Sequence, residues 1–343
     1  MEELQVSTYR NNNGVTCYMN SILSILQQTP LLVDYIIQVN DLDEDTIIYN
    51  LHKLFNATLS NTIESVNPIS LRTKCADKYF IWGENEQQDS SEFLTFIISN
   101  IQEELGKTVT FIPGREIIDE DEINNPLINI TSVYYQQLFT KKEYSPIIKM
   151  FSGLSKNHVT CSICNIQSIN FTPFILLDLT VPNNNTTLTD CLDNWIHPED
   201  LDDHNRYECS FCGIKCNCSK GQKIWNPPKI LVIHLKRFKK DMYGAIYSKN
   251  TSMVEYPIND LDISNYIDDD SPHKHKNEYN LFAVNVHHGL GKTLNFGHYI
   301  SFVKNRSDDK WYVFNDDHRI QRIRTKDDLI DNNAYMLFYL RKN

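Results

Sequence analysis

The order of two sequence patterns constrains this chain most: helical patterns come first and strand patterns follow. From Cys17 to Gln28, apolar residues recur at spacings of three and four, and Thr16 is an expected cap. Ser90–Leu105 repeats this spacing behind Asp89, which we expect to form a capping box with Glu92. The first 140 residues therefore predict a mainly helical region.

Strand patterns fill the part of the chain after about residue 141. Short runs rich in aromatic and β-branched residues alternate there with turn-prone stretches. The predicted strands are Phe171–Val181, Ile230–Phe238, Leu281–His287, His298–Lys304, Trp311–Phe314 and Tyr335–Leu340. Helices followed by strands indicate an α+β domain with a protruding subdomain, because alternating βαβ units are missing from the pattern. The acidic segment Pro113–Pro126 is expected to be a surface insertion.

Bulk composition narrows the class of protein. The 343 residues are 41% apolar and carry a formal charge of -11, which fits a globular chain and argues against a nucleic-acid partner. A window apolar enough for a membrane helix is missing, and the acidic start does not resemble a secretory signal. Nine cysteines in such a chain predict reduced thiols, so we expect the cytosol or the nucleus.

Three separated parts of the sequence carry the residues of a cysteine-nucleophile hydrolase. Cys17 lies at a predicted helix start, His298 on a predicted strand, and Asn315-Asp316 follow the histidine. The N–H groups and dipole of a helix start favour a thiolate, so we expect a lowered thiol pKa. The alternative for Cys17 is a buried structural cysteine.

Two cysteine pairs predict one structural zinc. Cys161 and Cys164 form the first pair, Cys209 and Cys212 the second, and both pairs have two residues between the thiols. Four thiolates suit a closed tetrahedral zinc that supports a fold without taking part in chemistry. The alternative is that one pair is merely buried.

Four further cysteines fall outside that pattern. Cys216 and Cys218 could replace one of the zinc ligands, but we expect free thiols on an exposed turn. Cys75 and Cys191 have no paired neighbour in the sequence and are expected in the core.

Six sequence blocks are spread over nearly the whole chain: Asn12–Ser21, Gln87–Leu94, Ile230–Phe238, Tyr279–Val284, Gly297–Phe302 and Trp311–Asp316. In sequence and in order, these blocks resemble those of the ubiquitin-specific protease family. The chain departs from the family at Tyr9-Arg10, where Gly-Leu is usual. The resemblance implies a single papain-like catalytic domain over residues 1–343. It also implies a helical thumb at about 1–140, zinc-bearing β fingers at about 141–228 and an antiparallel β palm at about 229–343.

The same resemblance assigns catalytic roles. It implies that Cys17 is the nucleophile, His298 the general base and Asn315 the residue that orients the imidazole. Asn12 matches the family position that donates to the oxyanion, and Asp316 matches one that can assist the histidine.

Substrate contacts are implied for four more residues. Gln87 and Asp89 should touch the ubiquitin tail, although Asp89 also reads as a helix cap. Tyr299 and the loop Gly289–Phe296 should flank the tail channel. His287 matches a family histidine near that channel, while its strand position favours packing.

The resemblance thus implies a thiol hydrolase that cuts the peptide or isopeptide bond after the terminal Gly-Gly of ubiquitin. Its expected partners are ubiquitin and ubiquitinated proteins, with neither nucleic acid nor membrane, and we expect a monomer. Two alternatives remain: a ubiquitin-binding module with weak catalysis, and a hydrolase for another ubiquitin-like modifier.

Overall fold

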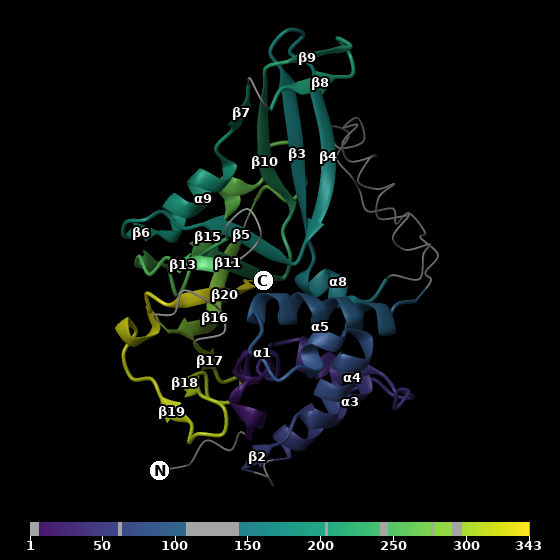
Figure 1. Cartoon of the computed structure of the whole chain (residues 1–343), viewed down its shortest axis with the longest axis vertical. Helices are drawn as coiled ribbons and strands as arrows, with labels where there is room; N and C mark the ends of the chain where they lie inside the picture. The colour runs from purple at the N-terminus through teal and green to yellow at the C-terminus, as the bar shows by residue number, and fades with distance from the viewer. Residues whose placement is uncertain are drawn as a thin grey trace.

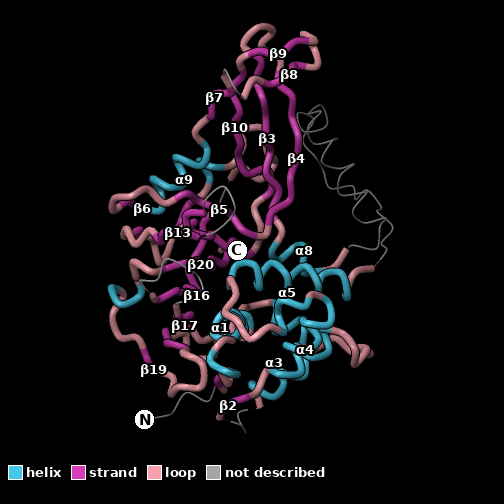
Figure 2. Tube along the Cα trace, viewed as in Figure 1, coloured by secondary structure: helices cyan, strands magenta, loops and turns pink. Residues whose placement is uncertain are grey.

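The computed structural model describes residues 7–60, 64–107, 144–202, 205–240, 246–275, 277–289 and 297–342. Figure 1 shows a helical region, a central sheet beside it, and a long narrow sheet that extends away from both. Helices gather in the early part of the chain and strands in the later part (Figure 2), which confirms the predicted α+β class. The predicted insertion Pro113–Pro126 and all but the first residue of Gly289–Phe296 lie outside the described residues.

The helices of the described residues include one that is completely buried, α1, which packs against β17 (His298–Lys304) and α5. The helices are α1 (Cys17–Leu26), α2 (Leu32–Ile36), α3 (Ile47–Leu59), α4 (Ile69–Lys78), α5 (Ser90–Glu104), α8 (Pro146–Phe151) and α9 (Leu188–Ile196). Every residue of α1 is buried, so this helix is the centre of the helical region and not an amphipathic surface helix. Within the described ranges, no helix combines the length and the apolar character needed to cross a membrane.

The predicted caps of α1 and α5 take different forms. Thr16 occupies the N-cap position, but its hydroxyl accepts from the N–H of Asn12 and makes no cap bond to α1. Asp89 caps α5 by accepting from the N–H of Ser91 at 2.7 Å. This bond goes to the second helical residue, whereas the expected box would use the third.

Eight strands form the central sheet in the order β19-β18-β17-β16-β20-β11-β5, with β15 beside β16. Their bounds are β5 (Leu176–Thr180), β11 (Ile230–Lys236), β15 (Leu261–Asp262), β16 (Glu278–His288), β17 (His298–Lys304), β18 (Trp311–Phe314), β19 (Gln321–Arg322) and β20 (Ala334–Arg341). Neighbours on this path are antiparallel except β5 and β11, which are parallel.

The central sheet is buried on both faces. Along β11, Ile230 and Val232 join the core that contains α1, while Leu231 and Ile233 join a second core that contains α9. Successive side chains of β11 enter two different apolar cores, which explains why the sequence of this strand is a continuous hydrophobic run. Because α1 packs against this sheet, Cys17 at its start lies close to β17.

A second sheet, in the order β4-β3-β10-β7, forms the long projection seen in Figure 1. Its strands are β3 (Gly153–Cys161), β4 (Gln167–Phe174), β7 (Glu199–Leu201) and β10 (Cys218–Asn226), and the hairpin β8 (Tyr207–Cys209) to β9 (Ile214–Cys216) lies at its tip. Three further pairs are β1 (Thr8–Tyr9) with β2 (Ser65–Val66), β6 (Thr186–Thr187) with β14 (Val254–Glu255), and β12 (Phe238–Lys240) with β13 (Ile246–Lys249).

One predicted strand is two. Phe171–Val181 divides into the end of β4 and the whole of β5, and these pair with different sheets. The apolar run is continuous across the division, so the sequence pattern could not show that the chain passes from one sheet to the other at Ile175.

Candidate active site

Cys17 is the first residue of α1 and is fully buried. The chain reaches it through a tight 3-10 turn, Asn12–Gly14, in which Asn13 (φ 57°) and Gly14 (φ 71°) adopt left-handed conformations. The backbone of Tyr299, Tyr18 and Cys17 itself lies close enough to the thiol to favour its charged form. The proximity of Tyr299 places the helix start beside β17, which begins at His298.

Burial controls the ionisation of this thiol. Desolvation raises the pKa of Cys17 to about 11, and the nearby Asp316 carboxylate adds to the rise, while the backbone donors lower it. The helix start was expected to lower the pKa, and that expectation is wrong for this structure. The cost of burying a charged sulfur exceeds the stabilisation that the N–H groups supply.

His298 is oriented by Asn315. The ring Nε2 lies 2.6 Å from Oδ1 of Asn315, which directly follows β18. An amide oxygen only accepts, so Nε2 carries the proton and Nδ1 keeps the lone pair in the neutral ring. Nδ1 is therefore the nitrogen available to take a proton from Cys17.

Asp316 is held in place more tightly than its neighbour. Its side chain is 4% exposed, and Oδ2 lies 3.8 Å from Nε2 of His298. Oδ2 accepts from the Asn11 amide at 2.8 Å, and Oδ1 accepts from the Asn20 amide at 2.7 Å. The structure thus gives Asn315 the short contact to the imidazole, and it makes Asp316 the anchor between the catalytic loop, the turn before Cys17 and α1.

Asn11 and Asn20 were missed as site residues in the sequence. Asn11 occurs in an Asn-rich stretch whose composition favours turns, Asn20 lies within the predicted helix, and only the fold reveals their shared carboxylate. Asn12, the predicted oxyanion donor, donates its amide to Asn67 at 2.9 Å in this structure. Its role at the oxyanion stays a prediction.

The predicted tail contacts at the start of α5 are engaged within the protein. Asp89 uses Oδ1 for the α5 cap, and its Oδ2 accepts from the Tyr335 hydroxyl at 2.7 Å. Because a carboxylate oxygen can accept two hydrogen bonds, Oδ2 can also accept one from the guanidinium of an arginine in a ligand. The side-chain oxygen of Gln87 is buried and has no hydrogen-bond partner among the described residues, so it can accept from a ligand.

Tyr299 and His287 pack inside the protein. Both side chains are 1% exposed, and their rings lie 4.5 Å apart beside Tyr335. Burial lowers the pKa of His287 to about 3, so the ring is neutral. The expectation that Tyr299 flanks the tail channel stays a prediction, and the buried side chain leaves the backbone of this residue to do so. A Cβ at Gly297 would lie 2.2 Å from the His287 ring, which explains the glycine before His298.

Six cysteine sulfurs meet at the tip of the long sheet. The sulfurs of Cys161, Cys164, Cys209 and Cys212 all lie within 4.8 Å of one another, with 3.8 Å between Cys161 and Cys212 and 3.8 Å between Cys164 and Cys209. Thiolates around a tetrahedral zinc at 2.3 Å are about 3.8 Å apart, so these residues fit the metal.

Cys216 and Cys218 belong to the same cluster. Their side chains are buried, and the sulfur of Cys216 lies 3.4 Å from that of Cys161. The expectation of free thiols on an exposed turn is wrong, because β9 and β10 turn both side chains toward the other cysteines. Cys75 and Cys191 are buried core residues, as predicted.

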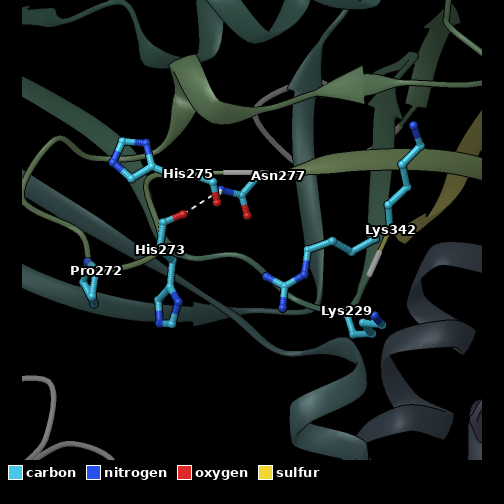
Figure 3. Close-up of a pocket in the computed structure, with 7 residues that line it drawn as sticks. Lys229, Pro272, His273, His275, Asn277 and Lys342 are labelled. Carbon is cyan, nitrogen blue, oxygen red and sulfur yellow. Dashed lines mark hydrogen bonds between the residues drawn. The ribbon is translucent and has the colours of Figure 1, made fainter. Parts of the chain in front are cut away.

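A separate cavity of about 430 Å³ contains none of the predicted catalytic residues. Figure 3 shows that the residues around it come from the loop at Pro272–Asn277, from Lys229 and from the end of β20. Its lining is basic, with Lys229, Arg341 and Lys342 beside two histidines, although Lys342 pairs with Asp260 and Glu278.

Comparison with known proteins gives a consistent family. The model of the ubiquitin carboxyl-terminal hydrolase family matches residues 10–339. Ubiquitin carboxyl-terminal hydrolase Usp2 of Drosophila melanogaster is 30% identical over 96% of this chain and 34% of its own length. Ubiquitin carboxyl-terminal hydrolase 2 of Homo sapiens is 30% identical over 96% of this chain and 54% of its own length. The protein of the same name from Gallus gallus is 31% identical over 98% of this chain and 94% of its own length. The chain thus spans between a third and about half of the first two relatives.

Among solved structures, the SAGA Ubp8/Sgf11/Sus1/Sgf73 DUB module bound to ubiquitin aldehyde contains a similar chain. The TM-score is 0.74 at 25% identity, covering 99% of this chain and 70% of that one. Fold, site geometry and relatives agree: the chain belongs to the ubiquitin carboxyl-terminal hydrolase family.

Proposed function

We propose that this protein is a cysteine-type deubiquitinase that cleaves the bond after the C-terminal Gly-Gly of ubiquitin. Family membership and the names of its relatives support the reaction class. The similar solved structure holds ubiquitin aldehyde, which supports ubiquitin as the ligand. The observation that carries the proposal is the meeting of distant segments: the backbone of Tyr299 lies close to the Cys17 thiol, and the adjacent His298 is hydrogen-bonded to Asn315.

The geometry supports a two-step acyl transfer. Nδ1 of His298 takes the proton of Cys17 as the sulfur attacks the glycine carbonyl carbon. The tetrahedral intermediate collapses, the C–N bond breaks, and the imidazolium gives its proton to the leaving amine. Water then attacks the thioester carbon while His298 accepts one of its protons. The C–S bond breaks, the imidazolium returns that proton to the sulfur of Cys17, and ubiquitin leaves as a carboxylic acid that loses its proton to solvent.

Burial of Cys17 fits a thiol that is ionised during the attack and not beforehand. With a pKa raised to about 11, the sulfur is protonated at neutral pH in the free protein. The hydrogen bond that Nε2–H of His298 donates to Oδ1 of Asn315 leaves the lone pair of the neutral ring on Nδ1 and holds the ring in place, so proton transfer and attack can be coupled.

Replacing the nucleophile tests this proposal. Cys17→Ala should abolish hydrolysis of a fluorogenic ubiquitin C-terminal amide and retain ubiquitin binding, because the sulfur supplies the bond-forming electrons and little contact area. Cys191→Ala is the matched control, since Cys191 is buried in the other core, and it should keep turnover.

A covalent ubiquitin-tail probe decides between the alternatives. Labelling of the wild type and not of Cys17→Ala supports the enzyme, while turnover by Cys17→Ala would refute the assignment. Binding of ubiquitin without turnover or labelling would indicate a binding module. Faster hydrolysis of another ubiquitin-like modifier's amide would indicate a different substrate.

We also propose that Cys161, Cys164, Cys209 and Cys212 hold a structural zinc. Their sulfur spacing supports it, and four thiolates leave no coordination position for substrate. The ion would hold the tip of the long sheet together, where the described apolar packing around the sulfurs is small.

A further inference from the structure

Two cysteines of the tip remain after the four proposed zinc ligands are assigned. Cys216 ends β9 and Cys218 begins β10, with one residue between them. Residues two apart on extended backbone face the same side, and here both sulfurs face Cys161. Cys218 is also paired with Cys161 in the register of β10 and β3.

The three sulfurs have metal-site spacing. Cys161 and Cys216 are 3.4 Å apart, Cys216 and Cys218 are 3.7 Å apart, and all three lie within 4.8 Å of one another. Zinc thiolates at 2.3 Å require sulfurs about 3.8 Å apart. All three cysteines are free thiols and are buried.

Ordinary packing accounts poorly for this arrangement. The cluster contains four buried cysteines, and the other apolar residues packed against it are only Val159, Leu201 and Tyr207 in the described part of the chain. A buried cysteine normally packs among aliphatic and aromatic side chains, as Cys75 and Cys191 do here.

We propose that the tip binds two zinc ions that share the thiolate of Cys161. The first ion takes Cys161, Cys164, Cys209 and Cys212, and the second takes Cys161, Cys216 and Cys218. The second ion has a fourth position that a water molecule or an outside ligand can fill, which distinguishes it from a closed structural site.

Charge balance permits the second ion. Zn²⁺ binding at Cys216 and Cys218 releases one proton from each thiol to solvent, so two positive charges enter as two protons leave. The net charge of the tip is unchanged. The shared thiolate therefore bridges two cations without adding charge to a protein that already carries -11.

Zinc stoichiometry tests the proposal. Full-length protein purified with zinc and dialysed against metal-free buffer should contain two zinc atoms per chain by mass spectrometry. Cys216→Ser/Cys218→Ser should contain one, and the control Cys191→Ala should contain two. One atom per chain in both the wild type and the double variant overturns the second site and leaves the four-cysteine site standing. No zinc in folded wild type removes both.

A second measurement uses the wild type alone, so its result does not depend on whether the double variant folds. Protein loaded with ¹¹³Cd should give two cadmium resonances of equal intensity, one from four sulfurs and one from three. Coupling between them is expected, because the Cys161 sulfur bonds to both ions. A single resonance at saturating cadmium overturns the proposal.

Discussion

At the scale of single residues, the candidate active site contains a thiol whose pKa the fold raises. Cys17 is fully buried, and three backbone N–H groups do not offset the desolvation that raises its pKa to about 11. The sequence proposed Cys17 as the nucleophile, which stays a prediction, and its expectation of a lowered thiol pKa is wrong for this structure. A local motif shows that Cys17 begins a helix. Its burial depends on β17, a strand that follows it by nearly three hundred positions.

The raised pKa predicts a steep pH dependence for the free protein. Alkylation of Cys17 by iodoacetamide requires the thiolate, so its rate should rise about tenfold per pH unit from pH 7 to pH 10, without a plateau near neutrality. Peptide-level mass spectrometry separates Cys17 from the other cysteines. A rate that levels off below pH 7 would instead reveal a preformed thiolate–imidazolium pair.

At the scale of elements, the site is a junction of α1, β17 and the loop after β18. Asp316 adopts a left-handed backbone (φ 48°), and its carboxylate accepts from Asn11 and Asn20. Family resemblance named Asn315 and Asp316 together and could not divide their work. The structure divides it, because Asn315 touches the imidazole and Asp316 joins the elements.

This division predicts different effects for two variants. Asn315→Ala should lower kcat by about 10²-fold with little change in thermal stability, because general acid–base catalysis contributes about 10²–10⁴-fold and depends on ring orientation. Asp316→Asn should lower stability by about 1–3 kcal/mol, since its new amide faces donors of Asn11 and Asn20.

Steady-state kinetics and thermal unfolding of both variants measure the two effects. Asn315→Asp serves as a control for Asn315→Ala, because a carboxylate can still accept from Nε2. Equal losses of stability in Asn315→Ala and Asp316→Asn would contradict the separate roles.

At the scale of the whole molecule, the sulfur cluster and the active site belong to different cores. Cys17 lies in the core shared by the helices and the central sheet, whereas the tip cysteines form a cluster of their own. Figure 1 shows the tip at the far end of the long sheet from α1. Loss of metal should therefore act on the projection before it acts on the catalytic residues.

Chelation tests that separation. Removing metal should raise KM for a ubiquitin C-terminal amide and lower the temperature at which the first unfolding transition occurs, while alkylation of Cys17 keeps its rate. Cys161→Ser, which lacks the shared ligand, should respond less to the chelator. A parallel loss of Cys17 reactivity would show that tip and active site unfold together.

Prediction from sequence reached the α+β class, the main strands and the two cysteine pairs, because periodicity and spacing are local. The sequence did not predict features that depend on contacts between segments far apart in the chain. The division of Phe171–Val181 between two sheets, the burial of Tyr299 and the gathering of Cys216 and Cys218 with Cys161 all depend on long-range pairing.

The hydrogen bond between Asn11 and Asp316 spans 305 positions. Ribosomes extend a chain at roughly 5–20 residues per second, so roughly 15–60 s separate the synthesis of these two residues. During that interval the nascent thiol has neither its imidazole nor the carboxylate that fixes its loop. Under the proposed function, we therefore expect the growing polypeptide to leave ubiquitin conjugates beside the ribosome uncut, and hydrolysis to begin only when the last strands pair.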